Sequence, residues 1–188
     1  MKDFVPDFKL GESYAGTDTD GNLLNSPLVG RTYEFEITED IAAAMNMSKR
    51  SIGMRVKARI FRNTLGSALA AGDVAIVAAT GGAAGLGTTT AKSSANSRLC
   101  HVVDPALPSS GVADDDLYLG IIEGPTKAKL ASGVTLTGGE LARADTGGVM
   151  THAVSASDAD DKITGTWLEA GTGDGSTLFE LDMHPTWS

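Results

Sequence analysis

Apolar and polar residues alternate along two stretches in the first third of the chain. The first stretch is 31–37, RTYEFEI, and the second is 52–62, IGMRVKARIFR. An alternation with a period of two is typical of a strand that buries one face and exposes the other. We therefore expect two half-buried strands, the first with acidic and the second with basic side chains on its polar face.

The rest of the chain consists of short apolar runs separated by turns of small residues. The segment 80–97 is expected to be a long loop, because it has almost no large apolar side chain. One short helix is expected from Thr38, as its N-cap, to Met47. The other runs expected to form strands are 74–79, 99–103, 117–123, 127–130, 134–136, 141–144, 149–154, 163–169 and 178–183.

This pattern predicts a mainly β fold. About nine to eleven short strands, at most one short helix, and no alternation of strands with helices are expected. These features favour a small β-barrel or a tulip-like sandwich over a parallel sheet flanked by helices.

A short β-unit occurs twice in the chain. Its first copy is 71–82, AGDVAIVAATGG, and its second copy is 138–148, GGELARADTGG, which begins 139 − 72 = 67 residues later when the turn glycines are aligned. A second pair, 115–120 and 160–165, has an acidic turn that leads into a strand with a glycine. Repeated strands and turns of this kind favour a two-repeat β core over residues 66–188.

Residues 1–30 differ from the rest and are expected to form an extended N-terminal arm. Turn sequences occur at 18–22 and 25–27, and the aromatic residues Phe4, Phe8 and Tyr14 are isolated among polar ones. Such a segment can lie along the surface of another protein, and the alternative is a loose terminus. The β domain is expected over 31–188, with added strands and the helix in 31–65.

The composition limits the classes of function that the chain is expected to have. The chain has 188 residues, a net charge of −9 and only 5% aromatic residues. The acidic balance weighs against binding to nucleic acid or to an anionic membrane, and no apolar run is long enough to cross a bilayer. No secretory signal is visible at the N-terminus, which favours synthesis in the cytoplasm. A core poor in large side chains favours a protein that is stabilised by partners or by further copies of itself.

Catalytic and metal-binding patterns are not found in the sequence. The Gly-rich run 81–88 lacks the lysine of a phosphate-binding loop, and the acidic clusters at 114–116 and 158–161 lack the spacing of a calcium loop. The three histidines have no metal-ligand spacing. Cys100 is expected to be a buried apolar residue, with His101 on the opposite face of its strand. We expect no cofactor, no metal and no enzymatic activity.

The basic face of the second strand is the strongest candidate for a binding surface. Arg55, Lys57, Arg59 and Arg62, with Lys49 and Arg50 just before them, are six of the 15 Lys and Arg residues of an acidic chain. Such a stripe can bind an acidic partner or another copy of the chain. The alternative is a solvated face that is balanced by Glu34 and Glu36 on the neighbouring strand.

Three segments resemble the head decoration, or cement, proteins of tailed bacteriophages. The first is 59–74, RIFRNTLGSALAAGDV. The second is 133–141, GVTLTGGEL, with 144–148, ADTGG. The third is 163–171, ITGTWLEAG, followed by 178–181, LFEL. The resemblance extends over about two-thirds of the chain, and residues 1–58 depart from the shortest members of the family.

The resemblance implies a small β-barrel or tulip-like sandwich that binds the outside of a capsid shell, often as a homotrimer. Its partners would be the major capsid protein and other copies of the chain, which places it on the capsid surface of a virion. The residues that we expect to contact the shell or other copies are Phe4, Phe8, Tyr14, Arg55, Lys57, Arg59 and Arg62.

Two alternatives remain open at this point. The first is a β-module of the tail or of a fibre of the virion. The second is a carbohydrate-binding β-sandwich or a hydrolase, in which Trp167 and Trp187 would stack on sugar rings. A tryptophan inside an apolar strand is more often part of the core.

Overall fold

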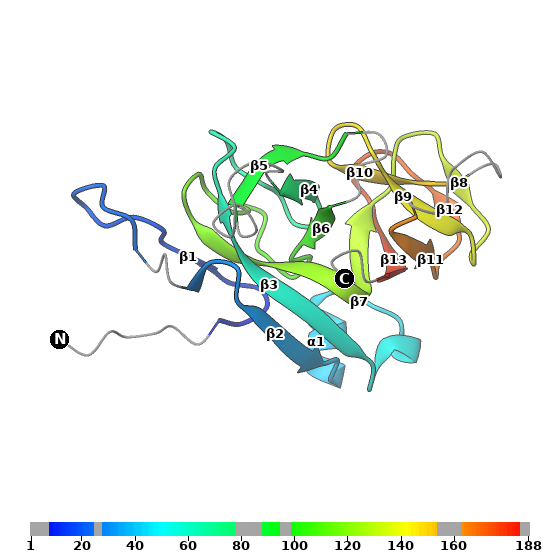
Figure 1. Ribbon diagram of the computed structural model, residues 1–188. Helices are drawn as coiled ribbons and strands as arrows, with labels where there is room; N and C mark the ends of the chain where they lie inside the picture. The colour runs from blue at the N-terminus through cyan, green and yellow to red at the C-terminus, as the bar shows by residue number, and fades with distance from the viewer. Residues whose placement is uncertain (1–7, 25–27, 78–87, 95–98, 154–162, 185–188) are drawn as a thin grey trace.

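The computed structural model describes residues 8–24, 28–77, 88–94, 99–153 and 163–184 (Figure 1). Over these residues the chain is mainly β, as the sequence predicts, with an α-helix, α1 (Glu39–Ala44), and a 3-10 helix, η2 (Lys49–Ser51). The strands are β1 (Ser13–Tyr14), β2 (Thr32–Glu36), β3 (Arg55–Asn63), β4 (Val74–Val77), β5 (Thr88–Lys92), β6 (Cys100–Val103), β7 (Leu117–Lys129), β8 (Thr135–Leu136), β9 (Leu141–Asp145), β10 (Val149–His152), β11 (Gly165–Trp167), β12 (Gly171–Thr172) and β13 (Leu178–Met183).

Five of these strands form a small barrel. β3 pairs with β7, β7 with β6, β6 with β4, and β4 with β5, all antiparallel. The ring closes because β5 lies parallel to the end of β3, where Arg62 is opposite Thr88 and Asn63 is opposite Thr89. The prediction of a small β-barrel is therefore confirmed, and β2 extends the ring along the free edge of β3.

The long strand β7 belongs to two sheets. Its first half lies in the barrel, and its second half pairs with β13, from Gly124–Met183 to Lys129–Leu178. β13 is followed by β11, β9 and β10, which make the second sheet (Figure 1). Gly124, with φ of +90°, lies where β7 changes its partner from β3 to β13. A side chain is excluded at this position, because a Cβ would collide with the carbonyl oxygen of Arg55. The sequence predicted two strands here, and the structure has one continuous strand through Gly124-Pro125.

The expected loop over 80–97 is wrong at its centre, where β5 forms. β5 is the sequence TTTAK, which has no large apolar residue to signal a strand. Threonine is β-branched and favours extended backbone, and the pairing of β5 with both β3 and β4 stabilises the strand. A short polar strand between two neighbours therefore escapes a prediction based on hydrophobic alternation.

The predicted helix is present but shorter than expected. Thr38 is its N-cap, and its side-chain Oγ1 accepts a hydrogen bond from the backbone N–H of Ile41 at 3.3 Å. The helix ends at Ala44, and Asn46 adopts a left-handed conformation with φ of +50°. The chain then turns into η2, which leads directly to β3.

The two copies of the repeated unit begin with the same turn in the described residues. Asp73 accepts a hydrogen bond from the N–H of Ala70 at 3.0 Å, and Glu140 accepts one from the N–H of Thr137 at 2.9 Å. In both copies the acid bonds to the backbone three residues earlier and follows a glycine with positive φ. The acid therefore stabilises the turn that leads into β4 in the barrel and into β9 in the second sheet.

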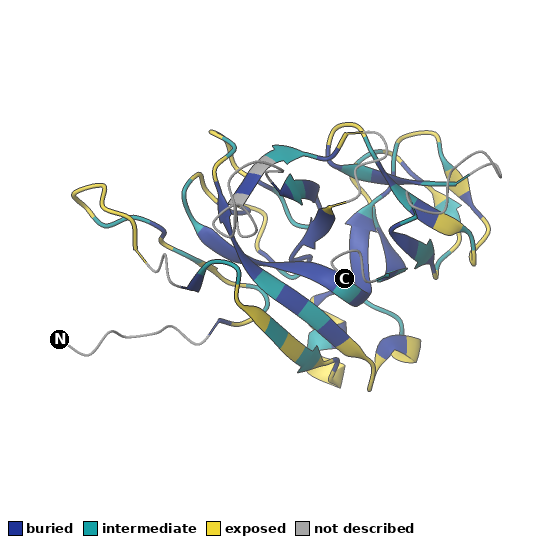
Figure 2. Cartoon of the chain, viewed as in Figure 1, coloured by how far each residue is buried: buried dark blue, intermediate teal, exposed yellow. Residues whose placement is uncertain are grey.

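The core lies between and inside these sheets (Figure 2). Trp167 is fully buried in the second sheet, and its indole N–H donates to the carbonyl of Thr151 at 3.4 Å. A buried tryptophan cannot stack on a sugar, so Trp167 does not support the carbohydrate-binding alternative. Trp187 lies outside the described residues.

Candidate interaction surface: the arm and the basic strand

The described part of the N-terminal arm is fixed to the barrel by aromatic packing. β1 pairs with the start of β7, with Tyr14 opposite Leu117. Phe8 is only 2% exposed and lies in the core, with its ring centroid 4.2 Å from that of Tyr14. Phe8 is buried, so its predicted contact with a partner would require this packing to open, whereas Tyr14 is partly exposed. Phe4 lies outside the described residues.

Two carboxylates also hold the arm through its backbone. The N–H of Gly11 donates to Asp104 Oδ2 at 2.6 Å, and the N–H of Gly16 donates to Asp116 Oδ1 at 3.3 Å. Asp104 is fully buried, and this burial raises its pKa to about 6. Burial raises the pKa of Asp116 as well. Sequence analysis missed both anchors, because an aspartate near a turn gives no sign of a distant backbone partner.

Arg62 forms the third anchor, and it binds carbonyl groups of the arm. Its Nη1 donates to the carbonyl of Gly16 at 2.7 Å and to that of Asp115 at 3.0 Å, and its Nη2 donates to that of Leu24 at 2.8 Å. The residue is 6% exposed, and burial lowers its pKa. Gly16 is required here, since a Cβ would collide with the Asp115 carbonyl oxygen.

Beyond these anchors the arm forms a hairpin, residues 16–24, that projects from the barrel (Figures 1 and 2). The hairpin closes through the N–H of Leu24, which donates to the Gly16 carbonyl at 2.7 Å. At its tip Asp18 Oδ1 accepts hydrogen bonds from the N–H groups of Asp20 and Asn22 at 2.9 and 2.8 Å. Hydrogen bonds from Asn22 lower the pKa of Asp18. Leu23 is 62% exposed, which is the largest value among the described large apolar residues.

The basic stripe of β3 is not one uniform surface. Arg55 lies 3.7 Å from Glu34 on β2, and Lys57 lies 2.7 Å from Glu123 on β7. The stripe is therefore partly neutralised by carboxylates on both neighbouring strands, one of which is the Glu34 that the sequence suggested.

The remaining members of the stripe become steadily less exposed along β3. Arg59 is half-buried, and burial lowers its pKa. Arg62 is covered by the arm. The alternation of buried and exposed residues ends at Ile60, because the end of β3 is enclosed by the barrel on one side and by the arm on the other. Whether any of these residues binds a partner remains a prediction.

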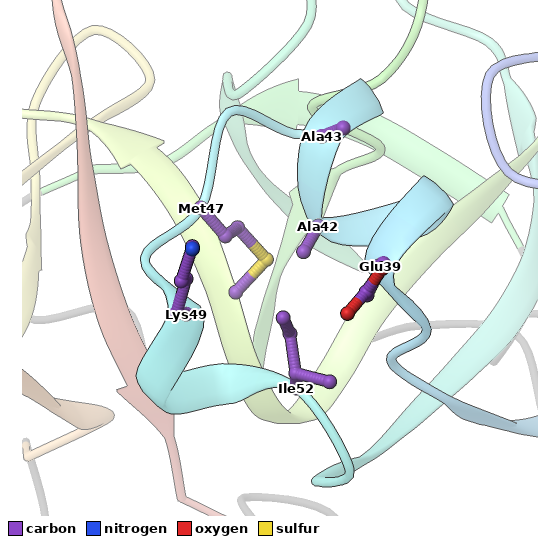
Figure 3. Close-up of a pocket in the computed structure, with 6 residues that line it drawn as sticks. All are labelled: Glu39, Ala42, Ala43, Met47, Lys49 and Ile52. Atoms are coloured by element: carbon purple, nitrogen blue, oxygen red, sulfur yellow. The ribbon is translucent and has the colours of Figure 1, made fainter.

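A second exposed surface lies where η2 joins β3, and sequence analysis did not single it out. A shallow pocket of about 300 Å³ there is lined by Glu39, Ala42, Ala43, Met47, Lys49 and Ile52 (Figure 3). Ile52 and Met54 are 37% and 39% exposed. The signal in the sequence was two large apolar residues in a basic turn, which the strand pattern had assigned to a buried face.

The buried Glu180 of β13 fixes η2 in place. It accepts hydrogen bonds from the N–H of Ser48 at 2.8 Å and from its hydroxyl at 3.1 Å, and another from the hydroxyl of Ser51. The η2 turn is thereby tied to the second sheet, although the two are far apart in the sequence. The pocket wall is therefore preformed.

The groups inside the barrel that could do chemistry are buried and engaged. Tyr118 Oη lies 2.7 Å from His101 Nε2 and 2.6 Å from Thr89 Oγ1, and the His101 ring stacks on Phe61 with centroids 3.7 Å apart. Burial lowers the pKa of His101 to about 3 and raises that of Tyr118. These side chains come from β3, β5, β6 and β7 and contact one another, so they share one face of these strands.

Cys100 has the environment that the sequence predicted. It is fully buried in the hydrophobic core, on the opposite face of β6 from His101. Burial raises the pKa of its thiol to about 12. No group of His, Cys, Asp and Glu residues with metal-binding geometry occurs in the described parts of the chain. Among those parts, too, no helix has the length and apolar character needed to cross a membrane.

Comparison with known proteins gives a distant structural likeness. No protein-family model and no curated protein matches the sequence. A solved structure of the N-terminal base of the head fibre protein gp8.5 of bacteriophage phi29 is similar over 68% of this chain and 93% of that chain, with a TM-score of 0.43 and 11% identity. At this level the likeness does not establish a shared fold or function, so both have to be argued from the residues of this chain.

Proposed function

We propose that the protein is a structural component of a phage virion that binds the outside of the capsid shell and clamps neighbouring capsid subunits. It would act by binding alone and would transform no substrate. The proposal combines the three segments that resemble decoration proteins with the ordered arm of this chain.

The arm is the observation that carries the proposal. Three separate groups, Asp104, Asp116 and Arg62, hold its backbone, and Phe8 is inserted into the core. An arm that is already ordered loses little conformational entropy when it binds a second protein. A rigid extension on a small β body therefore suits a protein that has to reach across a joint between two subunits.

Two of the three segments that resemble the decoration family, the second and the third, are neighbours in the fold. β8 and β12 pair with each other, and β9, β11 and β13 follow one another in the second sheet. These strands contain parts of the second and third segments, whereas the first segment, 59–74, runs from the end of β3 to the start of β4 in the barrel. The second and third segments therefore lie close together in the structure, which supports the use of the resemblance in the proposal.

Binding to a shell also compensates for small individual contacts. Each shell presents many identical sites, so copies that contact both the shell and one another gain in apparent affinity without any large single interface. This suits a chain whose exposed apolar residues are scattered in small groups.

The direct test uses purified capsids in the expanded state that lack this protein. We expect saturable co-sedimentation of the full chain with the capsids, and density on the outer surface of the shell by electron microscopy. Absence of binding would overturn the proposal. Density at the tail or on a fibre instead would also overturn it, in favour of the alternative virion module.

A further inference from the structure

The arm hairpin and the η2 turn have complementary surfaces. The hairpin, residues 16–24, presents the exposed Leu23 and Leu24 next to the carboxylates of Asp18 and Asp20. Its shape is fixed by the Asp18 hydrogen bonds and by Arg62 at its base. A short projection with an acidic tip and an exposed leucine on its flank is the kind of feature that can lie against a pocket of opposite charge on another protein.

The pocket beside η2 is suited to receive the exposed Leu23 side chain on the flank of the hairpin. Ala42 and Ala43 of α1 line one wall, and Met47 and Ile52 point into the space from the other side (Figure 3). Its volume of about 300 Å³ is large enough for a leucine side chain. Four of the six lining residues are apolar, and the charged ones are Lys49 and Glu39.

The charge of the η2 turn is opposite to that of the hairpin. Lys49, Arg50 and Arg55 are all exposed, and no acidic residue lies between 49 and 55. Arg55 is 3.7 Å from Glu34, and Glu39 lies across the pocket from Lys49, so the nearby acids reduce this charge but do not remove the basic turn itself. On a chain with a net charge of −9, this turn is the natural contact for an acidic hairpin.

One chain cannot make this contact with itself. Arg62 holds the hairpin at the end of β3, whereas the η2 turn precedes the start of β3 at Arg55. Arg55 and Arg62 are seven residues apart on β3, which separates these points by roughly 23 Å at about 3.3 Å per residue. In Figure 1 the hairpin projects away from α1 and η2.

We propose that the hairpin of one copy docks into the η2 pocket of a second copy. The two surfaces differ, so the contact is head-to-tail, and successive copies form a closed ring or an open row. Leu23 fills the pocket, and Asp20 lies against Lys49. The contact is small, so it is weak between free chains and becomes strong where copies are held side by side. It is measured on the purified protein alone, so its failure and that of the capsid proposal are distinguishable.

The test is disulfide trapping between two variants that each carry one introduced cysteine, Leu23→Cys and Ile52→Cys. The native Cys100 is fully buried and does not compete. With oxidised glutathione as the oxidant, and one variant tagged, the mixture is expected to form the disulfide-linked heterodimer at least about tenfold faster than Leu23→Cys mixed with Leu141→Cys. Leu141 is a matched control because it is 45% exposed and lies on β9, away from both surfaces.

Charge reversal tests the polar part of the contact. Adding Asp20→Lys to the first variant, or Lys49→Glu to the second, should slow trapping, and adding both should restore it. Glu39→Gln on the pocket side should speed trapping by removing a repulsive charge. Circular dichroism melting of each variant confirms that it is folded.

Two results would overturn the inference. One is trapping with Ile52→Cys that is no faster than with Leu141→Cys. The other is a Leu23→Cys homodimer that forms fastest, which would indicate a symmetric contact between two hairpins.

Discussion

At the scale of single residues, the buried carboxylate of Asp73 is the feature whose stability depends most on its partners. Asp73 is 1% exposed and lies 2.7 Å from the ammonium of Lys92 and 2.6 Å from that of Lys129. It also accepts a hydrogen bond from the N–H of Ala70. A buried carboxylate is tolerated only when charged groups and hydrogen-bond donors surround it in this way, because each unpaired buried charge lowers the stability of the folded protein.

The substitution Asp73→Ala should lower the free energy of unfolding by about 3–5 kcal/mol, since it leaves two ammonium groups near the barrel without their partner. Urea denaturation of the purified protein measures this change. The matched control is Glu34→Ala, which breaks the exposed pair with Arg55 and should cost no more than about 1 kcal/mol. Equal losses in the two variants would contradict this account of the buried pair.

His101 should make the protein less stable in acid. Its pKa in the folded protein is about 3, below the ordinary value of 6.5, so the unfolded chain binds a proton that the folded chain does not. The stability that depends on neutral His101 is therefore fully present above pH 6.5 and is lost progressively as the pH falls toward 3.

The variant His101→Gln removes this dependence but keeps a polar atom near Tyr118. Between pH 7 and 5, the urea midpoint of the wild type should fall further than that of the variant. Asp104 acts in the opposite direction, because its raised pKa favours the folded state as the pH falls through about 6, but it is present in both proteins and cancels from the comparison. A parallel fall in both would show that His101 is not responsible.

At the scale of elements, the arm and the barrel are joined at a few identifiable points. Arg62 makes two of these contacts, to the carbonyl groups of Gly16 and Leu24, from one side chain at the end of β3. The barrel core inside the ring does not use these contacts. The arm should therefore be able to loosen while the barrel stays folded.

The variant Arg62→Met tests this separation. It removes the donors to Gly16 and Leu24 while keeping an apolar stem, so the hairpin should exchange its Leu24 amide faster and be cut by proteases within 17–23. Hydrogen exchange with mass spectrometry measures amide protection in the hairpin and in the barrel, and the protection of β6 and β7 should remain. Arg55→Met, on the exposed end of the same strand, is the control and should leave the hairpin protected. Faster exchange throughout the barrel would instead make Arg62 part of the core.

At the scale of the whole molecule, the sequence predicts the fold class better than it predicts the surfaces. The alternation over 31–37 and over 55–60 of the second stretch, the cap at Thr38 and the opposite faces of Cys100 and His101 follow from local rules, and the structure confirms them. The strand β5 and the continuity of β7 do not follow from local rules, because both depend on pairing with strands that are distant in the sequence.

The candidate surfaces were harder to predict for the same reason. Arg62 belongs to the basic side of an alternating strand, but the arm covers it, and this contact joins residues 46 positions apart. Ile52 belongs to the apolar side, but its strand begins only at Arg55, so it lies exposed at the pocket. Alternation describes a strand in isolation and says nothing of where the strand begins or what covers its polar face.

The central claim is that the chain strengthens a phage shell by binding to it through an ordered arm. The measurement is calorimetric: the disassembly temperature of expanded capsids, alone, with saturating wild-type protein, and with Arg62→Met. The account predicts a higher temperature with the wild type and a smaller increase with the variant, whose arm is loosened. An unchanged disassembly temperature with the wild-type protein would contradict it.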